Sequence, residues 1–316
     1  MSLVEARDLV KRFGSLTAVD DISFSVERGE VVGFLGPNGA GKSTAMKIIS
    51  GFMEPTSGQA WIDGHNSHTD PIPARRHLGY LPEGAPAYAD MTVAAFLEFV
   101  AAMHGMTKAQ ANARLAELVD RVHLADVWNQ RIEALSKGFK RRVGIAQALV
   151  HDPDALILDE PTDGLDPIQK YEMRGLIRSI AQQKAIIIST HILEEVEAVC
   201  TRVIIIAKGR MLADATPGEL LARAPANGTL ALALATADPQ GAIDILTKHP
   251  GVGGIEMVQR VNGVTRLTIR VAKSRPSADE IAALLGRSNI AVTEYYAERA
   301  TLDDVFRQIA SHGAEN

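Results

Sequence analysis

The sequence predicts an α/β fold, with a mixed sheet core and a helical insertion, followed by a small α+β domain of the ferredoxin-like type. Short apolar runs alternate with helical patterns along the first part of the chain, which is typical of strands buried on both faces of a parallel sheet. A length of 316 residues suggests about two domains. The runs that predict buried strands are Val31–Leu35, Ala155–Leu158, Ala185–Ser189 and Val203–Ala207.

The segment that precedes the first buried run has a different pattern. Residues 4–13 (VEARDLVKRF) and 22–30 (ISFSVERGE) flank a polar turn, and we predict short antiparallel strands there. Val31–Leu35 then leads through a glycine-rich loop into a helical stretch. We therefore place that loop on a strand-to-helix turn of the α/β core.

Between Thr92 and Arg131 the apolar residues recur at helical spacing, without a strand signal. This pattern predicts a helical insertion at about residues 85–135. Within it, Phe96, Phe99 and Met103 stand at positions i, i+3 and i+7 and form an apolar stripe. We expect most of these three side chains to pack into the core.

The character of the sequence changes again after Leu221. Residues 222–228 (ARAPANG) predict a linker, so the first domain is assigned to residues 1–221 and the second to 229–316. The second domain has the order βαββαβ with a tight Asn-Gly hairpin turn, and it carries no cluster of catalytic residue types. We expect a packing or dimerisation role for it. Its predicted elements are a strand at 229–237, a helix at 239–249, strands at 254–261 and 264–272, a helix at 277–289 and a strand at 290–298.

Composition and charge narrow the class of protein. The net charge of −5 argues against a dedicated nucleic-acid binder, which is usually basic. A single cysteine, Cys200, cannot form an internal disulfide, and the first ten residues lack the apolar region of a signal peptide. The longest apolar runs are far shorter than the ~20 residues that span a bilayer. We expect a cytosolic protein whose membrane role, if any, comes through a partner.

The segment GPNGAGKST has the spacing G-x-x-x-x-G-K-S of a phosphate-binding loop. Its glycines allow a tight turn whose N–H groups face a polyphosphate, and the helix that follows adds its positive N-terminal end. Lys42 is expected to reach the β- and γ-phosphates, and the Ser43 hydroxyl to bind Mg²⁺. The candidate phosphate-binding residues are Gly36, Pro37, Asn38, Gly39, Ala40, Gly41, Lys42, Ser43 and Thr44.

Two further strand ends carry candidate catalytic groups. The apolar run ALILDE ends in Asp159, which is placed to hold Mg²⁺, and in Glu160, which could polarise the water that attacks the γ-phosphate. His191 follows another buried strand. Because ligands gather at the carboxyl ends of strands in such sheets, His191 could meet the γ-phosphate; a helix cap or a surface histidine is the alternative.

The segment LSKGFKRRVGIAQAL, residues 135–149, indicates how the site is completed. A short Ser-x-Gly turn, with Ser136 and Gly138, opens an amphipathic basic helix and forms a second helix N-terminus that can bind an anion. One nucleoside triphosphate does not need two such cradles from one chain, whereas two chains that face head to tail do. The run Lys140–Arg142 predicts a solvated helix face rather than a patch for nucleic acid.

In this order the segments resemble the ATP-binding subunit of ABC transporters, over roughly residues 3–221. By that resemblance GPNGAGKST is the Walker A loop, LSKGF the signature, ALILDE the Walker B strand and GLDP, with Asp166, the D-loop. His191 matches the switch histidine, and Phe13 lies where an aromatic ring stacks on adenine. The resemblance implies that ATP and Mg²⁺ are the ligands.

Two positions depart from the family's usual pattern. Lys137 replaces a glycine of the signature, and Glu83 stands where the Q-loop glutamine usually lies. A carboxylate at residue 83 could still ligate Mg²⁺ or a water, but its charge changes the coupling step. Both variants, and the closing segment TLDDVFRQI at 301–309, resemble the branch that serves type 2 exporters, which include drug, gliding-motility and copper-related systems.

The resemblance implies an ATP-hydrolysing motor that powers export through a separate membrane permease with multiple spans. It implies a second ATP-binding subunit with ATP at the interface, which we expect to be a second copy, and a location at the inner face of the membrane. A cytoplasmic helix of the permease is expected to dock beside the Glu83 loop, with Tyr88 and Met91 as candidate contacts. The alternatives are a soluble ABC ATPase that acts on ribosomes or DNA, and an importer ATPase. The cargo is not encoded in this chain.

Overall fold

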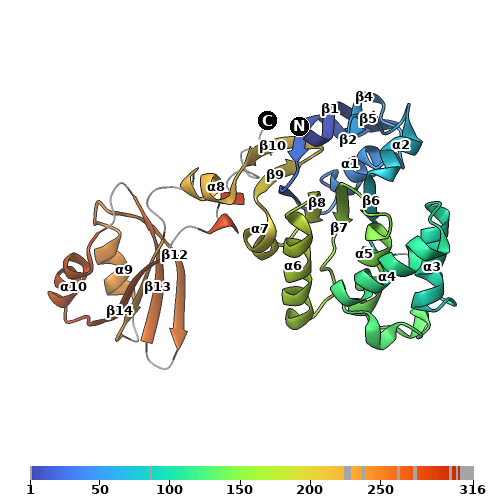
Figure 1. The fold of residues 1–316 in the computed structure, drawn as a ribbon. Coiled ribbons are helices and arrows are strands. Elements are labelled where there is room, and N and C mark those ends of the chain that lie inside the picture. Colours follow the sequence, from blue (N-terminus) through green and yellow to red (C-terminus); the bar gives the residue numbers. More distant parts are fainter. Residues whose placement is uncertain are drawn as a thin grey trace. The chain divides into compact units, whose positions relative to one another are not determined.

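The computed structural model of the chain describes residues 2–85, 87–223, 229–236, 239–261, 264–272, 276–298, 301–303 and 305–306. The chain divides into two compact units, with the boundary between Pro217 and Gly218, inside helix α8 (Pro217–Arg223). Figure 1 shows the elements of both units. Among the residues described, none of the helices combines the length and the apolar character that crossing a bilayer requires.

Six strands form the main sheet of the first unit, in the order β10-β9-β3-β8-β7-β6. Strands β9, β3, β8, β7 and β6 are parallel, and β10 pairs antiparallel with β9, so the sheet is mixed, as predicted. All four predicted apolar runs are strands of this sheet. The strand bounds are β3 Val31–Leu35, β6 Leu78–Leu81, β7 Ala155–Asp159, β8 Ala185–Thr190, β9 Arg202–Ala207 and β10 Arg210–Ala215.

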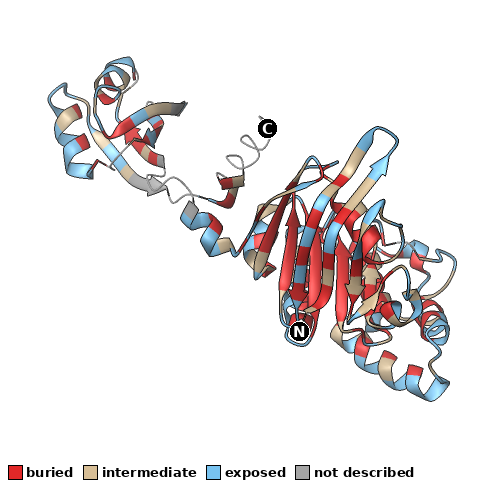
Figure 2. Ribbon diagram, turned by 90° about the horizontal axis from the view of Figure 1, so that it is seen from above, coloured by how far each residue is buried: buried red, intermediate tan, exposed pale blue. Residues whose placement is uncertain are grey.

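The two faces of the main sheet bury two different cores. Successive side chains of a strand point to opposite faces. Along β7, Leu156 and Leu158 therefore pack into the core that includes the helical insertion, whereas Ala155 and Ile157 pack into the core beneath the antiparallel sheet. Burial on both faces explains the continuous apolar runs, and Figure 2 shows these strands as almost entirely buried. Because β3, β8 and β7 are neighbouring parallel strands, their carboxyl ends lie at the same edge of the sheet.

A four-stranded antiparallel sheet, in the order β2-β1-β4-β5, packs over one of these cores. Antiparallel pairing of the first two strands was expected, but both are longer than the short strands predicted, because bulges let them follow each other over twelve residues. The bounds are β1 Ser2–Phe13, β2 Leu16–Glu27, β4 Ser57–Ile62 and β5 His65–Asn66.

The helical insertion is confirmed as helices α3 and α4, which lie side by side in Figure 1 and pack on α5. Thr92 caps α3, and Thr107 forms a capping box with Gln110 at the start of α4. The expectation that most of the apolar stripe is buried is wrong. Phe96 is 3% exposed, but Phe99 is 41% exposed and Met103 is 72% exposed, because the stripe is wider than the face that α3 presents to the core.

The helices of the first unit connect its strands and carry the loops of the candidate site. Two single-turn 3₁₀ helices, η1 and η2, lead from the insertion to α5. The bounds are α1 Lys42–Ile49, α2 Pro71–Arg76, α3 Val93–Met103, α4 Lys108–Arg121, η1 Ala125–Val127, η2 Ile132–Ala134, α5 Lys137–Leu149, α6 Pro167–Ala181 and α7 Leu193–Val199.

The second unit has the predicted element order βαββαβ. Its sheet order, β12-β13-β11-β14, with antiparallel pairing throughout, is that of a ferredoxin-like sandwich. The Asn262-Gly263 turn, residues 224–228 of the predicted linker and residues 307–316 lie outside the described part of the chain; linker residues 222–223 belong to α8. The bounds are β11 Thr229–Leu234, α9 Gln240–Leu246, β12 Val252–Val261, β13 Val264–Val271, α10 Ala278–Gly286 and β14 Val292–Glu298.

Candidate functional site

The predicted phosphate-binding loop leaves the carboxyl end of β3 and enters α1, as expected for a strand-to-helix turn. Its backbone requires glycine. Gly39 and Gly41 have φ angles of +79° and +103°, and a Cβ atom on Gly36 would lie 2.2 Å from the carbonyl oxygen of Ile206. A Cβ atom on Gly41 would meet the Ala18 carbonyl at 2.3 Å. The loop is therefore held tightly against its neighbouring strands, and Pro37, Asn38 and Ala40 complete it.

Lys42 opens α1 and folds back over the loop. Its Nζ donates hydrogen bonds to the carbonyl oxygens of Gly36 (2.8 Å) and Pro37 (3.2 Å), and the residue is only 5% exposed. Burial lowers the pKa of the Lys42 ammonium group. Three carboxylates oppose that shift, those of Glu160, Asp159 and Glu83. A buried ammonium group above a cradle of N–H groups is suited to bind a phosphate oxygen.

Asp159 ends β7 opposite the phosphate-binding loop and is 1% exposed. Its Oδ1 accepts hydrogen bonds from the hydroxyls of Ser43, at 3.3 Å, and Ser189, whereas its Oδ2 is buried and has no hydrogen-bond partner among the described residues. A buried carboxylate oxygen without a partner is costly unless a ligand binds it. Asp159 and Ser43 therefore fit a hard divalent cation such as Mg²⁺, which prefers oxygen ligands.

Glu160 and His191, which we call the catalytic pair after the roles that the sequence predicts for them, are brought together by the sheet. His191 Nδ1 lies 3.2 Å from Glu160 Oε1. The Glu160 backbone has φ +47°, and its N–H group is within hydrogen-bond distance of both the carbonyl and the hydroxyl of Ser189. A non-glycine residue with positive φ is uncommon, and such conformations cluster at active sites.

Two functional positions were not predicted from the sequence. Ser189 pairs with Asp159 in the register of β7 and β8, so a parallel alignment of the two strands could have found it. Glu195, on α7, is 5% exposed and accepts hydrogen bonds from the hydroxyls of Thr162 and Thr190. Because these threonines follow Glu160 and precede His191, Glu195 ties together the two chain segments that carry the catalytic pair.

The Ser136 turn forms a helix N-terminus, as predicted. The Ser136 hydroxyl caps α5 by accepting a hydrogen bond from the Phe139 N–H group at 3.3 Å. Asp166 caps α6 in the same way through Gln169, at 2.9 Å, and a Cβ atom on Gly138 would lie 2.8 Å from the Gln169 side chain. The structure thus brings Ser136, Gly138 and Asp166 together. Among the described residues, the hydrogen bonds of this turn do not reach the phosphate-binding loop.

Phe13 lies at the end of β1 and pairs with Leu16 of β2. It is 47% exposed, and Lys11 Nζ lies 5.3 Å from the centre of its ring. Ala18, two residues beyond Leu16, is the residue whose carbonyl faces Gly41. The phenyl ring is therefore an accessible surface close to the phosphate-binding loop along the β2 strand.

A cavity of about 380 Å³ lies beside Asp159. Burial, with Asp159 and Glu83, raises the pKa of the Tyr80 hydroxyl in its wall to about 12, so this phenol stays protonated. The cavity is lined by Lys47, Tyr80, Pro82, Glu83, Gly84, Arg141, Asp159 and Asp163.

The prediction that Lys140–Arg142 is a solvated helix face is wrong for Arg141 and Arg142, which are 7% and 8% exposed, because the α5 face that carries them packs into the unit.

Curated relatives match over different lengths of the chain. The Nod factor export ATP-binding protein I of Burkholderia orbicola is 34% identical over 315 residues, which cover 97% of this chain and 96% of that protein. The daunorubicin/doxorubicin resistance ATP-binding protein DrrA of Streptomyces peucetius is 31% identical over 99% of this chain and 94% of that protein. The probable multidrug ABC transporter ATP-binding protein YbhF of Escherichia coli is 36% identical over 70% of this chain, and the match spans 38% of that relative's length.

Solved structures resemble the first unit. One, described as the ATP-binding subunit of an ABC transporter, has a TM-score of 0.65 and 33% identity and covers 70% of this chain and 93% of that one. CbiO1 from Clostridium perfringens has a TM-score of 0.63 and 28% identity, over 70% of this chain and 91% of that one. The sequence profile of the family described as "ABC transporter" matches residues 19–163. By the extent and identity of these matches, the chain belongs to the ABC transporter family, as one of its ATP-binding proteins.

Proposed function

We propose that this protein is the ATP-hydrolysing motor subunit of an exporter and that it works with a separate membrane permease. The observation that carries the proposal is the meeting of Ser43, Asp159 and the catalytic pair at one edge of the main sheet. The relatives that match over almost the whole chain are named for Nod factor export and for daunorubicin/doxorubicin resistance, which favours export over import.

Each residue of the site has its own role in the proposed phosphoryl transfer. The loop N–H groups and Lys42 neutralise the β- and γ-phosphates of ATP. Asp159 and Ser43 hold Mg²⁺, which supplies positive charge to the phosphate oxygens when bound; Glu83 is a further candidate ligand. Glu160 accepts a proton from the attacking water, and His191 orients the Glu160 carboxylate through their contact. Thr44 adds a hydroxyl to the cradle, and Phe13 offers its ring to adenine.

We infer that the active form is a pair of chains. The Ser136 turn is a helix N-terminus that does not reach the phosphate-binding loop of its own chain within the described residues, so it is free to face the ATP of a second copy. A cassette of the same fold, with a TM-score of 0.62 and 23% identity, was solved as a dimer bound to ADP and Pi. In this arrangement Ser136, Gly138 and Asp166 complete the site of the partner copy.

The permease is proposed to dock on the helical insertion. Tyr88 is 56% exposed, and its ring packs edge-on against Phe96 and Phe99, at centroid distances of 6.2 and 5.8 Å. Tyr88 and Phe99 therefore expose adjacent aromatic rings, and α3 also carries the exposed Met103; neighbouring exposed apolar side chains of this kind mark protein interfaces. Met91 is partly buried against the core and is the weaker of the two predicted contacts.

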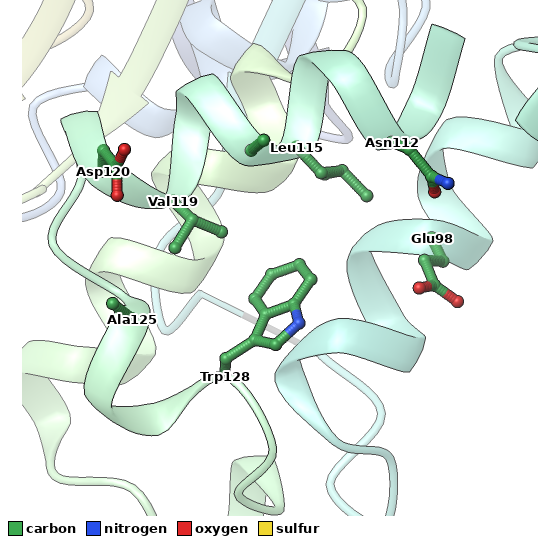
Figure 3. Close-up of a pocket in the computed structure, with 8 residues that line it drawn as sticks. Glu98, Asn112, Leu115, Val119, Asp120, Ala125 and Trp128 are labelled. Atoms are coloured by element: carbon green, nitrogen blue, oxygen red, sulfur yellow. The ribbon is translucent and has the colours of Figure 1, made fainter. Parts of the chain in front are cut away.

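The insertion also carries a pocket of about 500 Å³, which we propose as a second contact for the permease (Figure 3). Helix α3 contributes Glu98, and α4 contributes Leu115, Val119 and Asp120; the Trp128 ring points into the pocket between the two helices. Apolar side chains between two carboxylates, as Figure 3 shows, fit a cytoplasmic helix that presents an apolar side chain and a Lys or Arg. Such a contact would hold the protein at the inner face of the membrane.

One experiment tests the motor and names its partner. Glu160→Gln should bind ATP but hydrolyse it ~10²–10⁴-fold more slowly than the wild type, since it removes the general base. Tagged Glu160→Gln protein, purified with ATP and Mg²⁺ from detergent-solubilised cells, should then bring down a stoichiometric multi-span membrane protein. Turnover close to that of the wild type would remove Glu160 from its role. Recovery of ribosomal proteins or DNA without a membrane partner would replace export by a soluble function.

A further inference from the structure

Buried polar atoms without a partner gather around one cavity. Five buried side-chain atoms of the described residues lack a hydrogen-bond partner, and three of them belong to residues that line the 380 Å³ cavity beside Asp159. These three are the Tyr80 hydroxyl, Arg141 Nη1 and Asp159 Oδ2. Mg²⁺ accounts for the Asp159 oxygen, but it cannot bind a guanidinium group. Arg141 Nη1 therefore still lacks an acceptor, and a carboxylate is the acceptor that would also balance the guanidinium charge.

The neighbouring Arg142, on the same helix, has hydrogen-bond and ion-pair partners for its buried guanidinium group. Its guanidinium donates to the Val122 carbonyl at 3.1 Å and forms an ion pair with Glu172. The two arginines are equally buried, at 7% and 8% exposure, and are adjacent in sequence. A buried charge that is left unpaired is strongly destabilising, so Nη1 of Arg141 is expected to find its partner in the working state.

Two carboxylates besides Asp159 line the cavity, those of Glu83 and Asp163. Of these two carboxylates, Glu83 is the one whose charge affects the ionisable side chains at the centre of the site. It raises the pKa of both Tyr80 and Lys42, whereas Asp163 contributes to neither shift. Glu83 forms no hydrogen bond or ion pair with a described residue. When a polyphosphate binds, Glu83 is the third carboxylate beside it, after Asp159 and Glu160, and its negative charge repels the phosphates.

We propose that Arg141 is a positioning residue that pairs with Glu83 across this cavity when Mg²⁺ and ATP bind. The pair removes one negative charge from the phosphate site and fixes how far the Glu83 carboxylate can approach the metal. This inference rests on the proposed function, because it assigns a role within the same ATP site. The pair links helix α5, which carries Arg141, to the segment that carries Glu83 on the other side of the cavity.

A double-mutant cycle on the full chain tests the pair. ATPase rates are measured against ATP and against Mg²⁺ for the wild type, Arg141→Met, Glu83→Gln and the double variant. Each single change should lower kcat/KM by roughly tenfold, and Arg141→Met should also shift the apparent KM for Mg²⁺. In the Glu83→Gln background, the further effect of Arg141→Met should be small, and Arg141→Lys should retain more activity than Arg141→Met.

Two matched controls distinguish this positioning role from a contribution to folding stability alone. Arg142→Met should lower the unfolding temperature without any rescue by Glu83→Gln. Arg141→Met combined with Asp163→Asn should show independent, multiplying effects. Multiplying effects of Arg141→Met and Glu83→Gln, or coupling to Asp163 instead, would overturn the proposal while leaving the motor intact. A wild-type protein that does not hydrolyse ATP would instead overturn the proposed function itself.

Discussion

Among single residues, Glu195 is buried and acts on the proposed catalytic pair only through its two threonine partners. Glu195→Ala would leave the Thr162 and Thr190 hydroxyls without their buried acceptor, at a cost of ~1–3 kcal/mol for each unsatisfied group. Chemical denaturation should therefore show a loss of about 2 kcal/mol or more, and the ATPase rate should fall because both threonines hold the segments of the catalytic pair. Glu194→Ala is the matched control. Its side chain is 85% exposed and 3.9 Å from Arg174, so a stability change within ~0.5 kcal/mol is expected. Equal effects of the two changes would contradict the role of Glu195.

At this scale, the sequence predicts the residues whose function follows from a contiguous pattern. The phosphate-binding loop is local, because its glycines, Lys42 and Ser43 lie within nine residues. Glu195 and Arg141 are different, since their importance comes from burial and from partners on other elements. A glutamate in an acidic helix start and an arginine in a basic run have no sequence signal that separates them from solvated side chains.

Between elements, a stacked histidine pair joins the insertion to the core. His104 ends α3 and His151 follows α5; their rings are parallel, with centroids 3.8 Å apart. Burial, with His104 nearby, lowers the pKa of His151 to about 4, while its Nε2 contacts the Leu78 carbonyl at 3.1 Å. Burial lowers the pKa of His104 as well. The folded protein thus resists protonation that the unfolded chain accepts near pH 6.5.

Stability should therefore be lost as the pH falls from about 6.5 towards 4, because the unfolded state binds protons first in this window. His151 alone contributes about 2 kcal/mol of that loss at pH 5. The urea midpoint of the wild type, compared at pH 7.5 and 5.0, should drop more than that of His151→Gln. An identical drop in the wild type and His151→Gln would contradict this assignment.

The sequence predicts where the helices and strands lie along the chain better than it predicts what packs against each of them. Continuous apolar runs identify the central strands of the main sheet, because strands that are buried on both faces have such runs. The stripe of α3 identifies an apolar face, but periodicity cannot tell whether that face is covered by the same chain. Phe99 and Met103 are exposed in this chain, and in the proposed complex the permease covers them.

For the whole molecule, the open question is whether each site is built from two copies. A symmetric pair has two equivalent sites, each with the phosphate-binding loop of one copy and the Ser136 turn of the other. Lys42→Ala disables the first half of a site. Ser136→Asp disables the second by placing a negative charge against the phosphate, and it preserves α5 because Asp caps a helix as well as Ser does.

Each variant alone should be inactive, since both of its sites carry the defect. Mixing them in equal amounts should restore activity, because a mixed pair has one site with both defects and one with neither. If the two sites turn over independently, recovery reaches up to about a quarter of the wild-type rate, since half of the pairs are mixed and each has one intact site. The measurement is the ATPase rate against mixing ratio, with Lys42→Ala mixed with Glu160→Gln as the control. That control should not recover, because both changes lie in the same half of a site. No recovery in the first mixture would contradict sites that are shared between two copies and turn over independently.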